Sequence, residues 1–388
     1  MKLKSVRQIK GLKNKRVLLR LDLNVPVNKN QIKSTDAWRL DRAVETINYL
    51  ANKGAKIIIV SHLGRPAGKK VKALTLKPIA EYLSRVTGRS IDLWTDDVRS
   101  LAKPSQELLA GQVVLLENIR FDSREKKNSK SLAKRLSLLA DIYVNDAFGN
   151  IHRQDTSMLA ITDFLPSYAG LCLEEEVKNL SKILQTKKGL VLLLGGAKVV
   201  TKIKLLQKFV RSADYILLGG MLANTFLVAR GYDLGHSLLN KDELALAKKI
   251  KSKKVILPSD VAVATSLQAK QYFISDVDQI PAKMLAVDIG SKTVVEYGKI
   301  LNKAKVVVWN GPLGYFENDK IIDNSVKLAQ KLAKIKAKTV IGGGETVAMA
   351  SRLGLRNKFD FVSTGGGAMI AFLEGQKMPV LEKLKYKI

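Results

Sequence analysis

The sequence predicts an α/β protein with two parallel-sheet domains joined by an inter-domain helix, and three observations lead to this fold class. Short runs rich in Val, Ile and Leu recur along the chain, and glycine-rich or polar turns follow them. Amphipathic stretches with helical spacing lie between the runs, so strands and helices alternate. The runs are apolar on both faces, which is typical of parallel strands covered by helices on both sides.

The expected strands fall into two series, one in each half of the chain. Each is a short run of β-branched and aliphatic residues that ends at a turn. The strands are expected at 16–22, 56–62, 112–118 and 141–148 in the first series, and at 190–194, 214–220, 305–311, 338–344 and 359–367 in the second.

The first helix is predicted directly after the first strand. It begins after Thr35-Asp36, and Gly54 is its expected stop. Its apolar face would consist of Leu40, Val44, Ile47 and Leu50 or Ala51.

A long amphipathic segment separates the two series. Four apolar residues between 173 and 184 share one face, and the three glutamates at 174–176 suit a helix N-terminus. We therefore expect a helix over 172–186 that joins an N-terminal domain (1–171) to a C-terminal domain (187–376). The alternative is an ordinary crossover helix within one long sheet. The length of 388 residues favours two domains and leaves a third open.

The composition is that of a globular chain, with 46% apolar and 26% charged residues, which excludes a disordered or collagen-like protein. The single cysteine, Cys172, excludes an intrachain disulfide. Residues 1–16 lack the apolar segment of a signal peptide, and no apolar run approaches the ~20 residues of a membrane span. A soluble, cytoplasmic protein is expected.

The net charge of +31 raises the expectation of a nucleic-acid or membrane-surface partner. The distribution of the charge argues against both. Residues 1–170 carry 31 basic and 16 acidic side chains, residues 171–388 carry 35 and 19, and neither half has a basic tail. We expect a solvated, lysine-rich surface that also attracts small anionic substrates.

Polar and basic residues follow the strands of the first series, at the edge where open α/β sheets bind ligands. Four arginines and a histidine would converge there and would repel one another unless an anion lay among them. Any one of these arginines alone is more simply a solvated surface residue. Together they predict a site for a carboxylate or phosphate, with the candidate residues Asp22, Leu23, Asn24, Arg39, His62, Leu63, Gly64, Arg65, Arg120 and Arg153.

The strand at 190–194 runs into Gly195-Gly196-Ala197 and then into a helix, which predicts an anion site at the helix N-terminus. Lys198 and Lys202 share one face of that helix, where two like charges are unfavourable, so a bound polyanion is expected. The alternative is two exposed lysines in a lysine-rich protein. The turn is not a Walker A loop, because the pattern GxxxxGK[ST] is absent.

Further glycine turns follow other strands of the second series, and their N–H groups could approach a nucleotide. Tight packing of strand against helix is the alternative at any one turn. Glu345 is expected to bind Mg²⁺, with simple N-terminal capping as its alternative. The candidate nucleotide residues are Gly196, Ala197, Lys198, Lys202, Gly219, Gly220, Asn310, Pro312, Glu317, Gly342, Gly343, Gly344, Glu345 and Thr346, with Gly365, Gly366 and Gly367 in the last turn.

Over its whole length the chain resembles the phosphoglycerate kinases. The motifs that carry the resemblance are specific as a set. They are RLDLNVP (20–26), SHLGRP (61–66), LLENIRF (115–121), NDAFGNIHR (145–153), LLGGAKVVTK (193–202), WNGPLGYFE (309–317), GGGET (342–346) and STGGGA (363–368).

The resemblance implies two Rossmann-like domains joined by a helix, with residues 377–388 returning to the N-terminal domain. It implies reversible, Mg²⁺-dependent phosphoryl transfer from 1,3-bisphosphoglycerate to ADP, which gives 3-phosphoglycerate and ATP in glycolysis. Hinge closure of the two domains would bring the substrates together. The partners would be these small molecules, and the chain would be a monomer that binds neither nucleic acid nor membrane.

The resemblance also implies individual roles. The polar and basic candidate residues of the first series would bind 3-phosphoglycerate. Arg39 and Lys198 would be the catalytic residues at the transferring phosphoryl group, Lys202 would bind nucleotide phosphate, and Glu317 would bind the ribose. Parts of the adenosine pocket would be Gly219, Gly220 and Gly290, and the transferred phosphate would be oriented by Gly365, Gly366 and Gly367.

Two positions depart from the family pattern: Glu345 stands where an Asp is usual, and Asp155 stands where a second His is usual. The first concerns the metal geometry, and the second concerns the charge balance around Arg153.

Two other functions compete. A dinucleotide-binding oxidoreductase would need a clean G-x-G-x-x-G with a following acid. A nucleic-acid-binding protein would need a basic stripe with interleaved aromatics, which make up only 6% of the chain.

Overall fold

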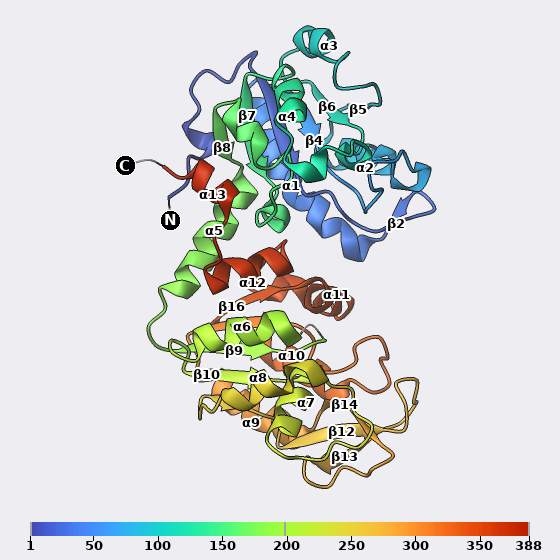
Figure 1. The fold of residues 1–388 in the computed structure, drawn as a ribbon, viewed down its shortest axis with the longest axis vertical. Helices are drawn as coiled ribbons and strands as arrows, with labels where there is room; N and C mark the ends of the chain where they lie inside the picture. Colours follow the sequence, from blue (N-terminus) through green and yellow to red (C-terminus); the bar gives the residue numbers. More distant parts are fainter. Residues whose placement is uncertain (1, 198, 387–388) are drawn as a thin grey trace. The chain divides into compact units, whose positions relative to one another are not determined.

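The computed structural model describes residues 2–197 and 199–386. The chain divides into two compact units, which are visible in Figure 1. Unit 1 contains Met1–Asn179 and Gln376–Ile388, and unit 2 contains Leu180–Gly375. Helix α5 (Leu171–Leu184) includes the point of division. It occupies nearly the range expected for the inter-domain helix.

Unit 1 is built on a six-stranded parallel sheet. Its central strand, β1, is flanked by β4 and β7 in parallel register. The strand order is β5 (Ile91–Trp94), β6 (Val113–Leu116), β4 (Lys56–Val60), β1 (Arg16–Leu21), β7 (Ile142–Asp146) and β8 (Ser167–Ala169).

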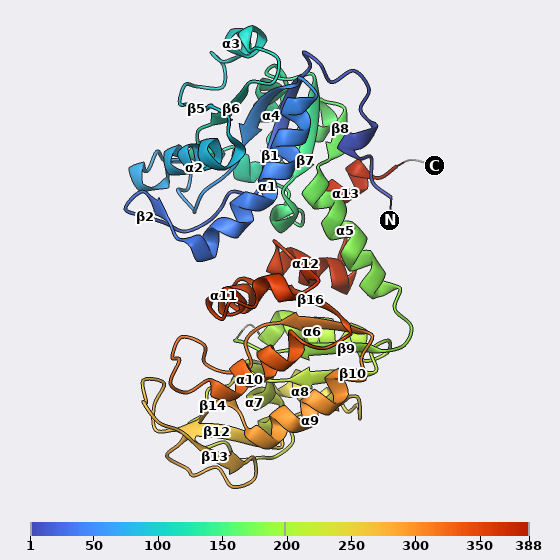
Figure 2. The ribbon, with the colours of Figure 1, turned by 180° about the vertical axis from the view of Figure 1, so that it is seen from behind.

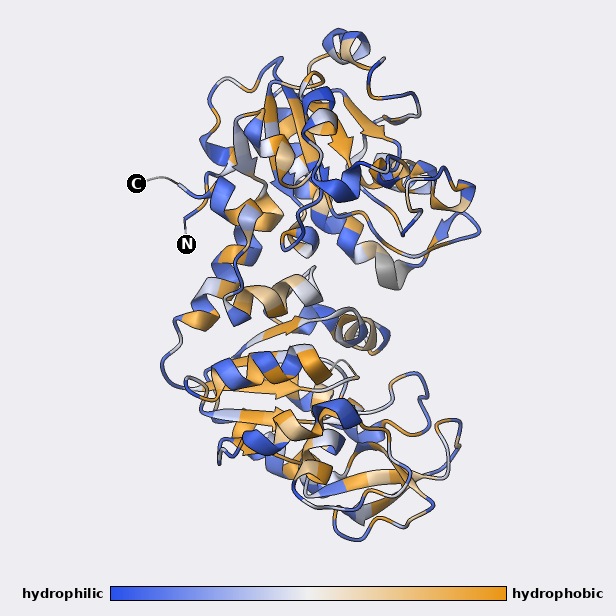
Figure 3. Cartoon of the chain, in the orientation of Figure 1, coloured by the Kyte–Doolittle hydropathy of each residue, from blue (hydrophilic) through white to orange (hydrophobic). Residues whose placement is uncertain are grey.

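Alternate residues of β1 pack on opposite faces of this sheet, as the period of a strand requires. Val17 and Leu19 pack with the apolar faces of α1 (Ser34–Asn52) and α2 (Lys77–Thr87). Leu18 packs on the other face with leucines of α4 (Lys130–Ser137). The sheet is therefore apolar on both faces, and Figure 3 shows apolar residues concentrated in the strands.

The first helix follows the predicted pattern closely. Leu40, Ile47 and Leu50 are fully buried, and Val44 is half-buried. The helix ends at Asn52, and Gly54 follows with a φ of 74°. A positive φ favours glycine, so the expected stop has a direct conformational cause.

The end of the chain returns to unit 1. Helix α13 (Pro379–Leu384) contacts β8, and the Lys4 N–H donates to the Leu384 carbonyl at 2.8 Å. Leu3 also forms an antiparallel bridge with Lys385. Figures 1 and 2 show the two ends of the chain beside each other in both views.

Unit 2 contains a second six-stranded parallel sheet. Its central strands are β9 (Leu190–Leu194) and β15 (Val306–Asn310). Helix α6 (Val199–Phe209) packs against α12 (Gly366–Glu374), and α9 (Ser291–Leu301) packs against α10 (Asp323–Leu332). The strand order is β11 (Val255–Ile256), β10 (Tyr215–Leu218), β9, β15, β16 (Lys338–Gly342) and β17 (Phe361–Val362).

The prediction of a parallel sheet in each half is confirmed, and each of the expected strands is present. The sequence did not predict the short strands β5, β8 and β11. It also did not predict a small antiparallel sheet in unit 2, whose order is β13 (Phe273–Asp276), β12 (Asp260–Ala264) and β14 (Leu285–Ile289). Among the described residues, no helix is both long and apolar enough to cross a bilayer.

Each parallel sheet has one switch point, where the connections leave two neighbouring strands in opposite directions. In unit 1 the chain leads from β1 to β4 on one side and from β7 to β8 on the other, so the switch point lies between β1 and β7. In unit 2 the corresponding strands are β9 and β15. Open α/β sheets bind ligands beyond the carboxyl ends of such strands. The predicted residues Asp22 and Asn24 follow β1 and Gly196 follows β9, whereas Gly290 follows β14 of the antiparallel sheet.

Candidate active site

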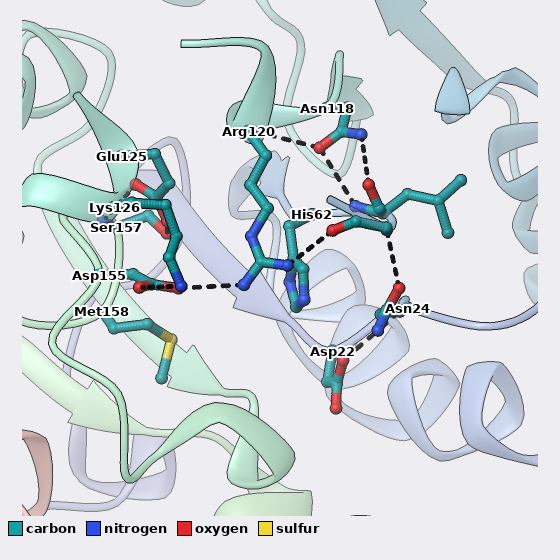
Figure 4. Close-up of polar contacts among 12 residues, drawn as sticks. Asp22, Asn24, His62, Asn118, Arg120, Glu125, Lys126, Asp155, Ser157 and Met158 are labelled. Atoms are coloured by element: carbon teal, nitrogen blue, oxygen red, sulfur yellow. Dashed lines mark hydrogen bonds and ion pairs between the residues drawn. The ribbon is translucent and has the colours of Figure 1, made fainter. Parts of the chain in front are cut away.

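Asn24 connects the turn after β1 to the loop after β4. Its Oδ1 accepts the N–H of Gly64 at 3.0 Å, and its carbonyl accepts a hydrogen bond from Arg39 Nη1 at 2.9 Å. Asp22 Oδ1 accepts the N–H of Asn24 at 3.4 Å, and Figure 4 shows this pair. The turn after β1 therefore positions both the Gly64 loop and the guanidinium of Arg39.

Asn118 joins the loops after β4 and β6, and the sequence did not single it out. Its Oδ1 accepts the N–H groups of Leu63 and Arg120, both at 3.1 Å. Its Nδ2 donates to the carbonyls of Leu63 and Leu74 at 2.8 and 2.9 Å. Because a buried amide must find partners for its polar atoms, this side chain holds the backbone of Arg120 in a fixed position relative to the Leu63 loop.

Arg120 is buried and contacts both loops of the site (Figure 4). Its Nη1 donates to the Gly64 carbonyl at 2.7 Å, and its Nη2 lies 3.4 Å from Asp155 Oδ2. Burial lowers the pKa of Arg120, and the nearby positive charge of Arg153 lowers it further. These two guanidinium groups repel each other, and a bound anion would relieve the repulsion.

His62 is fully buried among cations. Burial lowers the pKa of His62 far below its ordinary range, and the positive charges of Arg20 and Arg120 add to the effect. The imidazole is therefore neutral at physiological pH. Its Nε2 atom is buried without a hydrogen-bond partner among the described residues. Such a group is costly unless a ligand satisfies it.

Arg153 lies close enough to Arg120 and His62 for its positive charge to lower the pKa of both, and Arg65 follows Gly64 in the loop after β4. Arg65 is exposed, Arg153 is half-buried, and neither pairs with an acidic residue in the described part of the chain. Leu23 and Leu63 belong to the apolar core, so they contribute only backbone groups. We call the polar members of this site the anion-binding cluster: Asp22, Asn24, Arg39, His62, Arg65, Arg120 and Arg153.

In unit 2, Gly195 and Gly311 allow the ends of β9 and β15 to touch. A Cβ on Gly195 would lie 2.1 Å from the Pro312 carbonyl oxygen, and one on Gly311 would lie 2.1 Å from the Gly195 carbonyl oxygen. The buried Lys202 ammonium donates to that same Gly195 carbonyl. Only glycine fits at both positions. Because the Gly195 carbonyl accepts the bond from Lys202, the turn lies directly beside a buried cation.

A cavity of about 200 Å³ opens beside this turn. Its walls come from the glycine turns and from the antiparallel sheet, and Leu238, Val261 and Leu313 are among its apolar residues. Apolar walls with backbone N–H groups at one end suit a heterocycle that carries phosphates. The predicted nucleotide residues that line the cavity are Gly196, Ala197, Gly220, Pro312, Glu317 and Glu345.

The last two glycine turns pack backbone against backbone. A Cβ on Gly366 would lie 2.4 Å from the Cα atom of Gly343. Asn310 Nδ2 donates to the Gly342 carbonyl at 2.7 Å, and Thr346 Oγ1 accepts the Gly311 N–H at 2.6 Å. Asn310 and Thr346 thus tie the turns together, and helices α11 (Gly344–Arg352) and α12 begin next to each other.

Glu345 is an exposed residue in the first turn of α11. Gly343, the N-cap residue, has no side chain with which to cap the helix, and Glu345 Oε2 lies 3.4 Å from where a Cβ on Gly196 would stand. The described residues contain no group of three metal-ligating side chains. Mg²⁺ commonly uses one or two carboxylates together with substrate phosphates, so a single carboxylate at this turn fits it. Lys198 lies outside the described residues.

Gly219 and Gly290 do not line the cavity, although their neighbours Gly220 and Ile289 do. A Cβ on Gly290 would lie 2.1 Å from the Asp260 carboxyl carbon, and this carboxylate caps the start of α9. Gly290 therefore has a packing reason of its own. Sequence reasoning missed Asn224 and Asp288, which line the cavity as single polar residues without a motif.

The chain is similar to known proteins over nearly its whole length. The phosphoglycerate kinase family model matches residues 6–376. The chain is 42% identical to the phosphoglycerate kinase of Pseudothermotoga lettingae, with 97% of each chain covered, and 40% identical to that of Pelotomaculum thermopropionicum, with 98% of each covered. The solved structure of phosphoglycerate kinase from Coxiella burnetii superposes with a TM-score of 0.88 at 36% identity, with 98% of each chain covered.

The phosphoglycerate kinase structure from Pyrococcus horikoshii is also similar, with a TM-score of 0.87, 31% identity and 98% coverage of each chain. These identities extend over both units and cover nearly all of this chain and nearly all of each relative. They therefore show membership of the family as well as a shared fold. The chain therefore belongs to the phosphoglycerate kinase family, the glycolytic phosphotransferases that exchange a phosphoryl group between 1,3-bisphosphoglycerate and ADP.

Proposed function

We propose that the anion-binding cluster holds 3-phosphoglycerate and that the cavity of unit 2 holds the nucleotide. The observation that carries the first assignment is the convergence of Arg20, Arg120, Arg153 and Lys126 on the fully buried His62. A trianionic acid would neutralise this group of cations and satisfy the buried Nε2 atom of His62. Planar guanidinium groups match both its carboxylate and its phosphate.

Arg39 and Lys198 are proposed to contact the transferring phosphoryl group. Arg39 Nε is buried without a hydrogen-bond partner among the described residues, although its Nη1 is held by Asn24. A guanidinium that is held at one end retains donors for the oxygens on which charge develops. Phosphoryl transfer asks a protein chiefly for this positioning and charge stabilisation.

Glu345 is proposed to hold Mg²⁺ together with the nucleotide phosphates. The carboxylate lies beside the Gly196 turn, and the N-cap residue Gly343 has no side chain that could cap the helix in its place. Mg²⁺ bound there would neutralise negative charge on the phosphate oxygens. The backbone N–H groups at the starts of α6, α11 and α12 would orient those phosphates. Lys202, on α6, would bind them through its ammonium.

The two substrates are assigned to different units, so we propose that the units close about α5 during transfer. Closure would bring the donor and acceptor oxygens into line and would exclude water that hydrolyses an acyl phosphate. Small-angle scattering of the full chain tests this proposal. The radius of gyration should fall most with 3-phosphoglycerate and Mg-nucleotide together, and equal values in all states would contradict it.

We also propose that the protein is a cytoplasmic monomer whose partners are only these small molecules. The even spread of the +31 charge and the 6% aromatic content support a lysine-rich solvated surface over a nucleic-acid interface. Analytical ultracentrifugation tests the oligomeric state, and a dimer at micromolar concentration would overturn it.

Calorimetric titration of the full chain with 3-phosphoglycerate and, separately, with Mg-ADP tests the site assignment. Arg153→Ala should weaken 3-phosphoglycerate binding by roughly tenfold or more and leave ADP binding unchanged, because a charged hydrogen bond contributes about 1.5–3 kcal/mol. Arg99→Ala, which removes an exposed arginine of the same unit, is the matched control. Unchanged 3-phosphoglycerate affinity in Arg153→Ala would overturn the assignment.

A further inference from the structure

Four fully buried polar residues form a continuous hydrogen-bonded row that ends at the anion-binding cluster. Glu125 Oε1 accepts the Ser157 hydroxyl proton at 2.7 Å, and Ser157 Oγ accepts a hydrogen bond from Arg20 Nε at 3.0 Å. Arg20 Nη2 lies 3.0 Å from His62 Nδ1. We call Glu125, Ser157 and Arg20 the positioning row. Figure 4 shows Glu125 beside Ser157, and His62 near Arg120.

The direction of each hydrogen bond follows from the chemistry of the groups. A guanidinium has donors only, so the nitrogen that faces Arg20 must accept, and Nδ1 of His62 therefore carries no proton. Because His62 is neutral, its one ring proton lies on Nε2. That atom is the buried nitrogen without a partner among the described residues. The row thus determines which face of the imidazole is the donor.

The far end of the row explains why Arg20 keeps this orientation. Ser157 has one hydroxyl proton, which it donates in a hydrogen bond to Glu125. The hydroxyl oxygen therefore presents a lone pair to Arg20 Nε. Glu125 Oε2 also accepts the Ser157 N–H at 3.0 Å, which prevents the serine from turning away. Arg20 Nη1 donates to the Leu21 carbonyl, so all three nitrogens of the guanidinium have partners.

We propose that Glu125, Ser157 and Arg20 are positioning residues that hold His62 as the Nε2–H tautomer, so that it donates this proton to an oxygen of 3-phosphoglycerate. This inference rests on the proposed assignment of the anion-binding cluster. The opposite tautomer would turn a lone pair toward the anion. An imidazolium would add a further positive charge to a site whose cations already repel one another. A neutral donor of fixed orientation avoids both costs.

The test uses the full chain, ¹⁵N-labelled at histidine, because the sequence contains only three histidines. In the ligand-free wild type, the two ring nitrogens of His62 should show the shifts of a protonated Nε2 and an unprotonated Nδ1. A protonated Nδ1 would overturn the proposal directly. Ser157→Ala removes the middle of the row, and the two shifts should move toward each other as both tautomers become populated.

The matched control is Ser105→Ala. Ser105 is also fully buried and also accepts a hydrogen bond from an arginine of β1, Arg16, at 3.2 Å. It lies at the opposite end of the strand. Ser157→Ala should raise KM for 3-phosphoglycerate by roughly three- to tenfold, the loss of one hydrogen bond, with little change in KM for ATP. Ser105→Ala should change neither KM nor the spectrum of His62.

Wild-type KM and wild-type His62 shifts in Ser157→Ala would overturn the positioning role. Glu125→Gln is the second variant if Ser157→Ala fails to fold, and the same two readouts apply to it. Addition of 3-phosphoglycerate to the wild type tests the site assignment separately from the positioning role of Glu125, Ser157 and Arg20. If the His62 shifts do not respond to the acid, the site assignment fails, whereas the tautomer of the ligand-free protein reports on the positioning row alone.

Discussion

Arg120 and Asp155 form a buried ion pair, with Nη2 of the arginine 3.4 Å from Oδ2 of the aspartate. Lys126 lies 3.7 Å from the other carboxylate oxygen. Asp155 stands where the resemblance to the family implies a histidine, so this chain has an anion where a neutral or cationic ring would be expected. The carboxylate compensates the cations of the site while no substrate is bound.

Asp155→Asn should therefore separate stability from substrate affinity. Loss of the buried counter-charge should lower the free energy of unfolding by about 3–5 kcal/mol, because two cations lose their partner. KM for 3-phosphoglycerate should fall, because the substrate no longer meets a negative charge. Urea unfolding measures the first effect, and initial rates at varied 3-phosphoglycerate concentration measure the second. Equal stability and a higher KM would contradict the role assigned to Asp155.

Asp288 predicts a pH-dependent stability. It is fully buried beside the cavity, where burial raises its pKa to about 7 from the ordinary value of 3.8. Between these two values the folded state holds a proton that the unfolded state has released. The free energy of unfolding should therefore fall as the pH rises from about 4 to about 7, by an amount on the order of 1–3 kcal/mol.

Asp288→Asn should remove this part of the slope, since asparagine does not titrate. Denaturant unfolding at several pH values measures it. Asp278→Asn, at an exposed aspartate of the same unit, is the control and should keep the wild-type slope. The same slope in Asp288→Asn and in the wild type would show that Asp288 does not titrate in this range.

Gly366 and Gly367 offer a matched pair at the start of α12. A Cβ on Gly366 would lie 2.4 Å from Gly343 Cα, whereas one on Gly367 would meet nothing within 4 Å. Gly366→Ala should force α11 and α12 apart, lower kcat and destabilise unit 2 by about 1–3 kcal/mol. Gly367→Ala should leave stability unchanged or raise it by up to about 1 kcal/mol, because alanine favours the helix. Thermal unfolding of both variants decides, and equal effects would contradict the close packing.

Glu345→Gln tests the metal assignment. The variant should raise the Mg²⁺ concentration required for half-maximal activity and lower kcat, while the melting temperature without ligand barely changes. Glu345→Asp should keep substantial activity, because the resemblance to the family implies the shorter acid there. A stability loss of about 1 kcal/mol with unchanged metal dependence would instead favour a capping role.

The sequence predicted the sheets and the motif turns because those features repeat locally. Periodicity predicted the strands. Polar and basic residues at strand ends predicted the site in unit 1, and glycine turns predicted the site in unit 2. Asp155 was recognised as a departure, but its ion pair with Arg120 required the structure. The antiparallel strand β13 was missed because its residues are largely exposed and carry no buried pattern.

The positioning row was missed for a different physical reason. Arg20 and Ser157 lie 137 positions apart and meet only through tertiary packing. Neither has a spacing that distinguishes it from an ordinary strand or loop residue. Gly290 is a different case, because its place in the adenosine pocket stays a prediction. A glycine that resemblance assigned to the nucleotide has a local cause in the Asp260 cap, which no motif reveals.

The central claim is that Arg39 stabilises the transferring phosphoryl group, and the kcat of Arg39→Ala tests it most directly. The guanidinium of Arg39 donates one hydrogen bond to the Asn24 carbonyl. Removal of the guanidinium should leave the fold intact and cost several kcal/mol of transition-state stabilisation. The account predicts that kcat falls by at least about a hundredfold, with little change in melting temperature or in KM for ATP. A wild-type kcat in Arg39→Ala would contradict it.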